Sequence, residues 1–286
     1  MGISIDNAMR ESKDRIDNLK KHALHMRELS LKMAYNCGGS THLGGGLSLI
    51  EALAVLYGSV MNTADHSLPY NEQDKFILSK GHGVLGYYAA LAEFGIISED
   101  LLDTFLLDGS DLIAHPVMKP EIGLEASTGS LGQGISLAVG FALAAKKKGY
   151  TYKTYVLCGN GECNEGSVWE ACMSAVNFRL DNLTLFIDNN HMQSDGASDG
   201  IMDVSDKYPG MLDALGFQTF VVDGNDIGQV CEALHTAHEK GKPKAVIGNT
   251  VKGKGISFME NNADWHHNRL TKDQYDAAIS ELQVLK

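Results

Sequence analysis

Five short apolar runs constrain the fold of this chain more than any other feature of its sequence. Each run is four to eight residues long, is rich in residues that favour strands, and is bounded by glycine or polar residues. Helical patterns separate successive runs. This alternation predicts an α/β fold with a mostly parallel central sheet and helices on both faces. The predicted strands lie at residues 76–79, 155–158, 183–187, 217–222 and 244–251, and the helices include 135–148, 167–177 and 227–239.

A helical layer is expected at the N-terminus. Residues 6–35 repeat apolar side chains every three or four positions, from Ile16 through Met33, which is the spacing of one helix face. No internal repeat and no Pro/Ser-rich linker interrupts the chain, so residues 1–286 are expected to form a single domain. Three further elements are predicted: a glycine-rich turn at 38–46 and helices at 48–60 and 272–285.

Charge and cysteine content disfavour several classes of function. The formal net charge is −12 and no long run of Lys or Arg occurs, so a nucleic-acid or anionic-membrane partner is not expected. The five cysteines form no CxxC pair, which disfavours a disulfide framework or a structural zinc site. The polar N-terminal stretch predicts no signal peptide, and no apolar run approaches the roughly 18 residues of a membrane span. We therefore expect a cytoplasmic protein.

Polar segments follow two of the predicted strands, at residues 159–166 (GNGECNEG) and 188–193 (DNNHMQ). Ligands of open parallel sheets bind outside the carboxyl ends of the strands. Glycines let a backbone pass close to a phosphate, and a helix that begins after them attracts negative charge. Side-chain oxygens on two neighbouring strand ends are suited to Mg²⁺. Either segment alone is typical of an ordinary turn, and only the pair points to a phosphate and metal site.

Together the two segments resemble the signature of thiamine-diphosphate enzymes, in which a GDG-type turn is followed by a DNN-type segment. Asn190 follows Asn160 by 190 − 160 = 30 residues. Further segments, in the same order as in the family, extend the resemblance over nearly all of the chain and make it specific to transketolase-type enzymes. They are STHLG (40–44), SKGHG (79–83), AHP (114–116), GSLGQG (129–134) and KGKG (252–255) followed by Trp265-His266.

The resemblance implies roles for individual residues. Asn160 stands where the family has a metal-binding Asp, Asn190 matches a second Mg²⁺ ligand, and the backbone carbonyl of Met192 matches a third. The cofactor, thiamine diphosphate, is expected to contact His82, Gly129, Ser130, Leu131, Gly161, Glu162, Asn190 and His266. The residues implied in catalysis are His42, His82, His115, Glu165 and His266.

Three of the implied catalytic histidines, His42, His82 and His115, are expected to surround the reacting sugar. Histidine suits that work because its ordinary pKa, about 6.5, lets it give and take protons near neutrality. Glu165 matches a buried acid close to a contact between chains. Residues without such motifs are expected to be structural: the helical histidines His22, His25, His235 and His238, and the core-facing Val168, Trp169 and Cys172.

The sequence departs from the family pattern in two respects. Asn160 replaces the acidic ligand, and a neutral amide is a weaker partner than a carboxylate for a hard cation. The chain is also about half as long as a one-chain transketolase, and after Trp265-His266 only one helix is predicted. The glutamate that activates the aminopyrimidine and the aromatic pocket around it are therefore expected on a second polypeptide, together with the pyrimidine-binding and C-terminal domains. An α₂β₂ assembly is implied.

The leading hypothesis is a subunit that transfers a two-carbon ketol unit from a ketose phosphate to an aldose, with the carbanion chemistry supplied by the cofactor. Two alternatives stay open. One is a related synthase that makes a deoxyketose phosphate from pyruvate and a triose phosphate. The other is a catalytically weak or inactive homologue that stabilises a true subunit, which Asn160 favours. The sequence does not identify the sugar phosphates.

Overall fold

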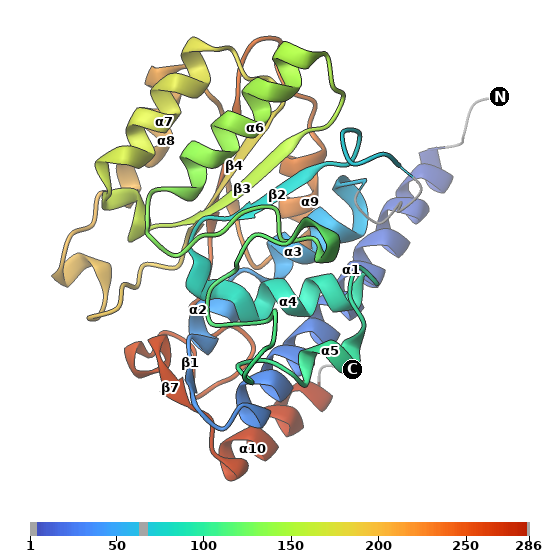
Figure 1. Ribbon diagram of the computed structural model, residues 1–286, viewed down its shortest axis with the longest axis vertical. Coiled ribbons are helices and arrows are strands. Elements are labelled where there is room, and N and C mark those ends of the chain that lie inside the picture. Colours follow the sequence, from blue (N-terminus) through green and yellow to red (C-terminus); the bar gives the residue numbers. More distant parts are fainter. Residues whose placement is uncertain (1–4, 63–67, 285–286) are drawn as a thin grey trace.

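A five-stranded parallel sheet forms the centre of the molecule. The computed structural model describes residues 5–62 and 68–284. The strands lie in the order β2-β3-β4-β6-β5, and every neighbouring pair is parallel (Figure 1). The predicted α/β class and all five predicted strands are confirmed, with boundaries shifted by up to two residues. The strands are β2 Lys75–Leu78, β3 Thr154–Gly159, β4 Leu183–Asn189, β5 Gln218–Asp223 and β6 Lys244–Asn249.

Helices cover both faces of this sheet, which explains the unbroken apolar runs in its strands. Every residue of β2, β3 and β4 is buried. One face packs against α1 (Ile5–Asn36), α3 (Ile50–Val55), α4 (Val84–Glu93) and α9 (Ile227–His235), and the other against α6 (Gly134–Lys148), α7 (Gly166–Asn177) and α8 (Tyr208–Leu215) (Figure 1). The remaining α-helices are α2 (Leu43–Leu47), α5 (Glu99–Leu102) and α10 (Lys272–Gln283).

The prediction of a glycine-rich turn at 38–46 is wrong for residues 43–46, which belong to the buried helix α2. Close packing explains why glycine is tolerated in this helix. A Cβ added at Gly86 of α4 would lie 2.4 Å from the carbonyl oxygen of Gly46, so the two backbones can approach only without side chains. The burial of α2 therefore outweighs the low helix propensity of its three glycines.

Other boundaries also differ from the predictions. The helix predicted at 48–60 begins at Ile50 as α3 and continues as a π-helical turn over Leu56–Val60. The helix predicted at 227–239 ends at His235. There the buried ammonium of Lys244 donates to the carbonyls of Ala233 and Leu234 at 3.3 and 3.1 Å, and so satisfies the last turn of α9. Residue 285, predicted to lie in the last helix, falls outside the described residues.

Two short strands form a separate antiparallel ribbon that the sequence did not predict. Strand β1 (Ser40–Thr41) pairs with β7 (Asn268–Arg269), in the register Ser40 with Arg269 and Thr41 with Asn268. Figure 1 shows the ribbon beside α2, away from the main sheet. The ribbon joins two segments more than 200 residues apart in the chain.

None of the helices within residues 5–62 and 68–284 is long and apolar enough to cross a membrane. The five cysteines all lie among the described residues and are free in this fold. All four histidines expected to be structural have simple partners in this fold, and for His238 the partner is the Thr184 hydroxyl, 3.1 Å away. His25 and His22 hydrogen-bond Glu93, the latter at 2.6 Å, and His235 lies 3.1 Å from the Ser59 hydroxyl.

Candidate active site

Four histidines predicted from separate motifs meet in one cluster around His42. The ring centroid of His42 lies 5.3 Å from that of His82, 6.0 Å from that of His115 and 5.2 Å from that of His266. A fifth ring, that of His267, is nearer still, at 4.5 Å from His42. The sequence reasoning missed His267, because its only signal is its place next to His266.

The histidines come from separate segments of the chain, three of them next to short helical turns or strands and His115 from a loop. His42 follows β1, and His82 lies in a 3₁₀ turn (Gly81–Gly83) that follows β2. His266 ends another 3₁₀ turn, and only His267 separates it from β7, so the β1–β7 ribbon holds it near His42. His115 enters over Gly129, whose φ is +144° and where a Cβ would lie 2.9 Å from the imidazole. Only glycine allows that close approach.

Burial keeps these imidazoles neutral. The pKa of His42 falls to about 4, mainly because of burial and then because of the neighbouring His267 and His115. Burial also lowers the pKa of His266 to about 4, with Lys252 as the next cause. The pKa values of His82 and His115 are lowered by burial as well. A neutral imidazole offers one donor and one acceptor, which suits a ring of them to sugar hydroxyls and to proton transfer.

A cavity of 170 Å³ adjoins the histidine cluster and is bordered by the two segments that follow β3 and β4. The register of the sheet explains why these segments meet, since Gly159 of β3 pairs with Asp188 of β4. His82 and His266 line both the cluster and this cavity. Its other lining residues are Gly45, Lys80, Leu131, Gly159, Asn160, Gly161, Glu162, Asn190, Met192, Gln193, Ser194 and Lys252.

Lys252 brings a buried positive charge to the cavity. Its side chain is 2% exposed, and burial lowers its pKa to about 8. Its ammonium lies 2.8 Å from Nδ1 of His266 and donates to the Gln193 carbonyl at 3.2 Å. Within residues 5–62 and 68–284, no carboxylate forms an ion pair with it. A buried cation without a fixed counterion is suited to an anionic ligand. The sequence reasoning noted its segment but did not name Lys252 as a site residue.

Lys80, by contrast, is neutralised within the chain. It forms an ion pair with Asp188, which is fully buried, and donates to the Gly45 carbonyl at 3.0 Å. The Asp188 carboxylate also accepts from Ser48 Oγ at 2.6 Å and from Asn190 Nδ2 at 3.2 Å. Asp188 therefore orients Asn190 toward the cavity as part of a satisfied buried network.

The three predicted metal ligands border the same cavity. Asn160 donates its amide N–H to Ser198 Oγ at 2.9 Å, which leaves its amide oxygen for a ligand. The Asn190 amide oxygen accepts from the Met192 N–H at 3.1 Å and retains a second lone pair. Among the described residues no group of three His, Cys, Asp or Glu side chains could hold a metal ion. The three predicted donors are all oxygens, which hard cations such as Mg²⁺ prefer, but they contribute no negative charge.

Comparison with known proteins identifies the family. A family model described as transketolase, thiamine diphosphate binding domain, matches residues 19–283. The chain belongs to the transketolase family. It is 42% identical to one of the subunits of the apulose-4-phosphate transketolase of Actinobacillus succinogenes, over 93% of this chain and 96% of that one. It is 39% identical to the 6-deoxy-6-sulfo-D-fructose transketolase subunit SqwG of a Clostridium species, over 95% and 98%.

Solved structures agree with this family assignment and with the fold. The transketolase of Campylobacter jejuni superposes with a TM-score of 0.84 at 30% identity, over 93% of this chain. The chain spans only 42% of the length of that protein. The resemblance to the N-terminal part of transketolase, a transferase family, is therefore confirmed.

Two predicted residues of the transketolase site, Glu162 and Glu165, have surroundings that the motifs did not indicate. Glu162 lines the cavity, yet its carboxylate points into the protein and accepts from Ser79 Oγ at 2.5 Å and from the N–H groups of Gly132 and Gly159 at 2.9 and 3.1 Å. Burial raises its pKa in spite of these bonds. Glu162 thus ties three loops together, and a contact with the cofactor remains a prediction.

Glu165 was expected to be a buried acid, and in this chain it is exposed. It directly precedes α7 and lies next to Gly132, where an added Cβ would be 2.8 Å from the Glu165 side chain. The predicted cofactor contacts Ser130 and Leu131 are exposed as well, the latter by 36%. The expected place of Glu165 close to a contact between chains, and the expected cofactor contacts of Ser130 and Leu131, stay predictions.

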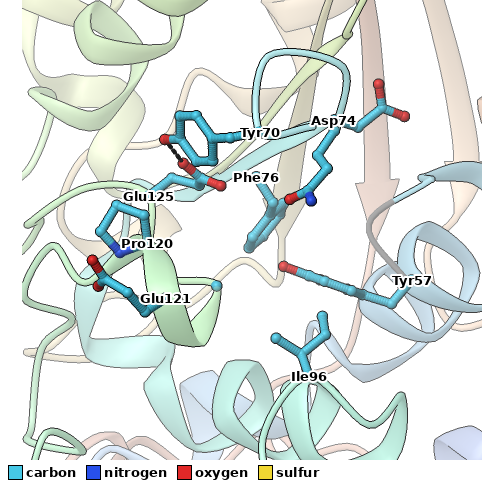
Figure 2. A pocket seen from close by; sticks show the side chains of 10 residues that line it. Tyr57, Tyr70, Asp74, Phe76, Ile96, Pro120, Glu121 and Glu125 are labelled. Carbon is cyan, nitrogen blue, oxygen red and sulfur yellow. Dashed lines mark hydrogen bonds between the residues drawn. The ribbon is translucent and has the colours of Figure 1, made fainter. Parts of the chain in front are cut away.

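A second, larger cavity lies at the opposite end of β2, away from the histidines. It has a volume of 490 Å³ and lies among Tyr57, Tyr70, Phe76 and Glu125 (Figure 2). The Tyr70 hydroxyl donates to Glu125 at 2.5 Å, and the buried Lys75 ammonium lies 3.4 Å from Glu125. The buried Glu125 carboxylate of this cavity thus has partners within the chain.

Proposed function

We propose that this chain is the diphosphate-binding subunit of a split transketolase that transfers a two-carbon ketol unit between sugar phosphates. The observation that carries the proposal is the junction between Lys252 and His266. The Lys252 ammonium lies 2.8 Å from the imidazole of His266, whose ring centroid is 5.2 Å from that of His42. His266 therefore borders both the place for an anion, next to Lys252, and the place for a hydroxylated substrate, next to His42. A single domain over residues 1–286 would carry these two places.

Thiamine diphosphate, when bound, supplies the carbanion-stabilising chemistry of such a transfer. Lys252, Gly161 and the following helix end would hold its diphosphate. The ammonium of Lys252 donates to Nδ1 of His266, which places the ring proton on Nε2. Nε2 can then donate to an oxygen at the junction of cofactor and sugar. His42, His82 and His115 would hold the hydroxyls of the sugar and move protons between them.

Asn160, Asn190 and the Met192 carbonyl would hold Mg²⁺ together with diphosphate oxygens. Because these protein donors are neutral, the charge of the metal is balanced by the diphosphate alone. This favours a site in which metal and cofactor bind as one unit. An Mg²⁺ titration of the Asn160→Asp variant at fixed thiamine diphosphate tests the assignment. About tenfold tighter apparent Mg²⁺ affinity, a gain of about 1.4 kcal/mol, is expected. Unchanged or weaker affinity would show that Asn160 is not a ligand.

A second chain is needed to complete the site. The relatives of similar length are each named as one subunit of a transketolase, and a one-chain transketolase is more than twice as long. Exposed apolar side chains support a docking surface on the face covered by α6 and α7. Leu137 is 42% exposed and Met173 is 52% exposed. We place the pyrimidine-binding and C-terminal domains on that partner, in an α₂β₂ complex. The five free cysteines fit the reducing cytoplasm.

One observation favours a second candidate function. The neutral Asn160 in the metal site would suit a catalytically weak homologue that stabilises a true subunit. The two candidates differ in cofactor binding and turnover, and both can be measured on the same complex.

The test is to reconstitute the chain with a candidate partner of about the length that the family's second half requires. Calorimetry would measure thiamine diphosphate binding with and without Mg²⁺, and a coupled assay would measure two-carbon transfer. Donors to assay include apulose 4-phosphate and 6-deoxy-6-sulfo-D-fructose, after the names of the relatives. We expect turnover only with the partner present. Turnover by the isolated chain would contradict the split-enzyme proposal, and cofactor binding without transfer would favour the weak homologue.

A further inference from the structure

The backbone of Asn160 is held in place, so only its side-chain amide can turn. Its N–H donates to the Asp188 carbonyl at 3.1 Å, and its own carbonyl accepts from the Cys163 N–H at 3.1 Å and the Tyr208 hydroxyl at 3.0 Å. Rotation about the last side-chain torsion exchanges the amide oxygen and the amide nitrogen. Only the oxygen can bind a cation, because the nitrogen carries two N–H donors and no acceptor.

Ser198 is the partner of that amide nitrogen. Asn160 Nδ2 donates to Ser198 Oγ at 2.9 Å, and it has no other acceptor among the described residues. The two residues are 3% and 1% exposed, so solvent does not reach this bond. The backbone of Ser198 is fixed as well, because its N–H donates to the His191 carbonyl at 2.9 Å and the preceding Ala197 forms a bridge with Met192. Ser198 thus closes the turn that carries the predicted donor Met192, and its hydroxyl contacts the predicted donor Asn160.

An amide and a carboxylate make different demands on this partner. When an amide oxygen binds a cation, the amide N–H groups turn away from the cation, and a buried N–H that finds no acceptor there costs free energy. A carboxylate has no N–H, so it makes no such demand. A serine hydroxyl can accept from an amide N–H, whereas a methyl group cannot. The neutral side chain of Asn160 therefore depends on an acceptor at position 198.

We propose that Ser198 is a positioning residue of the metal site, which accepts the Asn160 amide N–H and so lets a neutral amide oxygen serve where the transketolase signature has an aspartate. This proposal rests on the proposed function, because it takes Asn160 as a ligand of Mg²⁺. Ser198 acts through Asn160 and takes no part in the bond changes. The pair of Asn160 and Ser198 accounts for a metal site that works without the carboxylate.

The test measures the apparent Mg²⁺ affinity by calorimetry at fixed thiamine diphosphate, in the complex of the chain with its partner. Ser198→Ala is made in the wild-type chain and in the Asn160→Asp variant, because only the wild type presents an amide N–H to position 198. Ser198→Cys keeps the size of the side chain with a weaker acceptor, and it replaces Ser198→Ala if that variant does not fold. Ser205→Ala removes the hydroxyl of another buried serine, whose N–H donates to Asp203, and serves as the matched control.

We expect Ser198→Ala to weaken Mg²⁺ binding about tenfold in the wild-type chain, equivalent to about 1.4 kcal/mol, and less than about threefold in the Asn160→Asp variant. Ser198→Cys should weaken it about threefold in the wild-type chain, and Ser205→Ala should leave it within about twofold. Equal weakening by Ser198→Ala in the two chains would mean a merely structural role. That result, or an unchanged affinity in the wild-type chain, overturns this inference. A wild-type complex that binds no thiamine diphosphate in the presence of Mg²⁺ would instead overturn the proposed function.

Discussion

The two cavities at opposite ends of β2 differ in how their buried charges are satisfied. In the larger one, Glu125 receives a hydrogen bond from Tyr70 and an ion pair from Lys75. In the smaller one, Lys252 has only the neutral His266 ring and a backbone carbonyl as partners among the described residues. The smaller cavity is the one that adjoins the histidine cluster. A buried charge without a counterion therefore indicates the site better than the volume of the cavity does.

The two buried lysines make this contrast specific. Lys75 is 1% exposed and Lys252 is 2% exposed, and burial lowers the pKa of both. The Glu125 carboxylate opposes the lowering of the Lys75 pKa. The Lys75 ammonium also lies 3.2 Å from the centroid of the Tyr70 ring. Lys75 is therefore a structural cation, whereas Lys252 stabilises little until an anion arrives.

The largest effect on stability is expected when the buried ion pair between Lys80 and Asp188 is broken. Lys80→Met leaves Asp188 as a fully buried, unpaired carboxylate, so we expect a loss of about 3–5 kcal/mol in the free energy of unfolding. Urea denaturation measures it. The double variant Lys80→Met/Asp188→Leu should recover part of the loss. A loss below about 1 kcal/mol for the single variant would show that the pair is not needed for folding.

The next effect separates the two cavities. Lys252→Met should weaken thiamine diphosphate about 10–100-fold, because a hydrogen bond to a charged group contributes about 1.5–3 kcal/mol. Its unfolding free energy should stay the same or rise, since an unpaired buried charge is removed. Lys75→Met should do the reverse, losing about 3 kcal/mol of stability with unchanged cofactor affinity. Calorimetry measures the cofactor affinity of both variants, and urea denaturation measures their unfolding free energy. If the two variants changed cofactor affinity and stability in the same way, the distinction between the two lysines would be wrong.

A smaller effect concerns pH. The pKa of His42 is about 4 in the folded chain and about 6.5 when unfolded, so the unfolded state takes up a proton first as pH falls. The stability associated with the neutral ring is complete above pH 6.5 and is lost between about 6.5 and 4. In His42→Gln, the loss of stability between pH 7 and 4.5 should be about 1 kcal/mol smaller, a figure discounted for partial exposure. An unchanged loss in urea titrations at the two pH values would contradict the shift.

The smallest effect lies in the larger cavity. Tyr70→Phe removes one hydrogen bond to Glu125 and leaves the ion pair with Lys75, so a loss of about 0.5–1.5 kcal/mol is expected. Cofactor affinity should not change. The midpoint of urea denaturation and a cofactor titration measure the two quantities. If cofactor binding weakened along with stability, the larger cavity would have to be coupled to the active site.

Local patterns were enough to predict the fold class, and the resemblance to transketolase-type motifs implied most of the candidate site. Strands β2, β3, β4 and β6 could be predicted from short apolar runs, because strands covered on both faces are apolar throughout. The edge strand β5 is only partly buried and was predicted from its strand-favouring residues. Four histidines of the cluster could be named because each lies in its own motif. Lys252 and His267 could not be singled out. Lys252 is distinguished by having no carboxylate partner among the described residues, and His267 by the nearness of the His42 ring, and both features depend on distant segments.

The sequence by itself determined the alternation of strands and helices and the segments that meet at the carboxyl ends of β3 and β4. Only the tertiary structure decided that β6 lies between β4 and β5, that the glycines of α2 are helical, and that Glu165 is exposed. It also paired Ser40 with Arg269, which brings His267 to His42. The physical reason is the range of the forces involved. Hydrophobic periodicity acts within one element, whereas burial, close backbone packing and charge neutralisation are set by residues far apart in the chain.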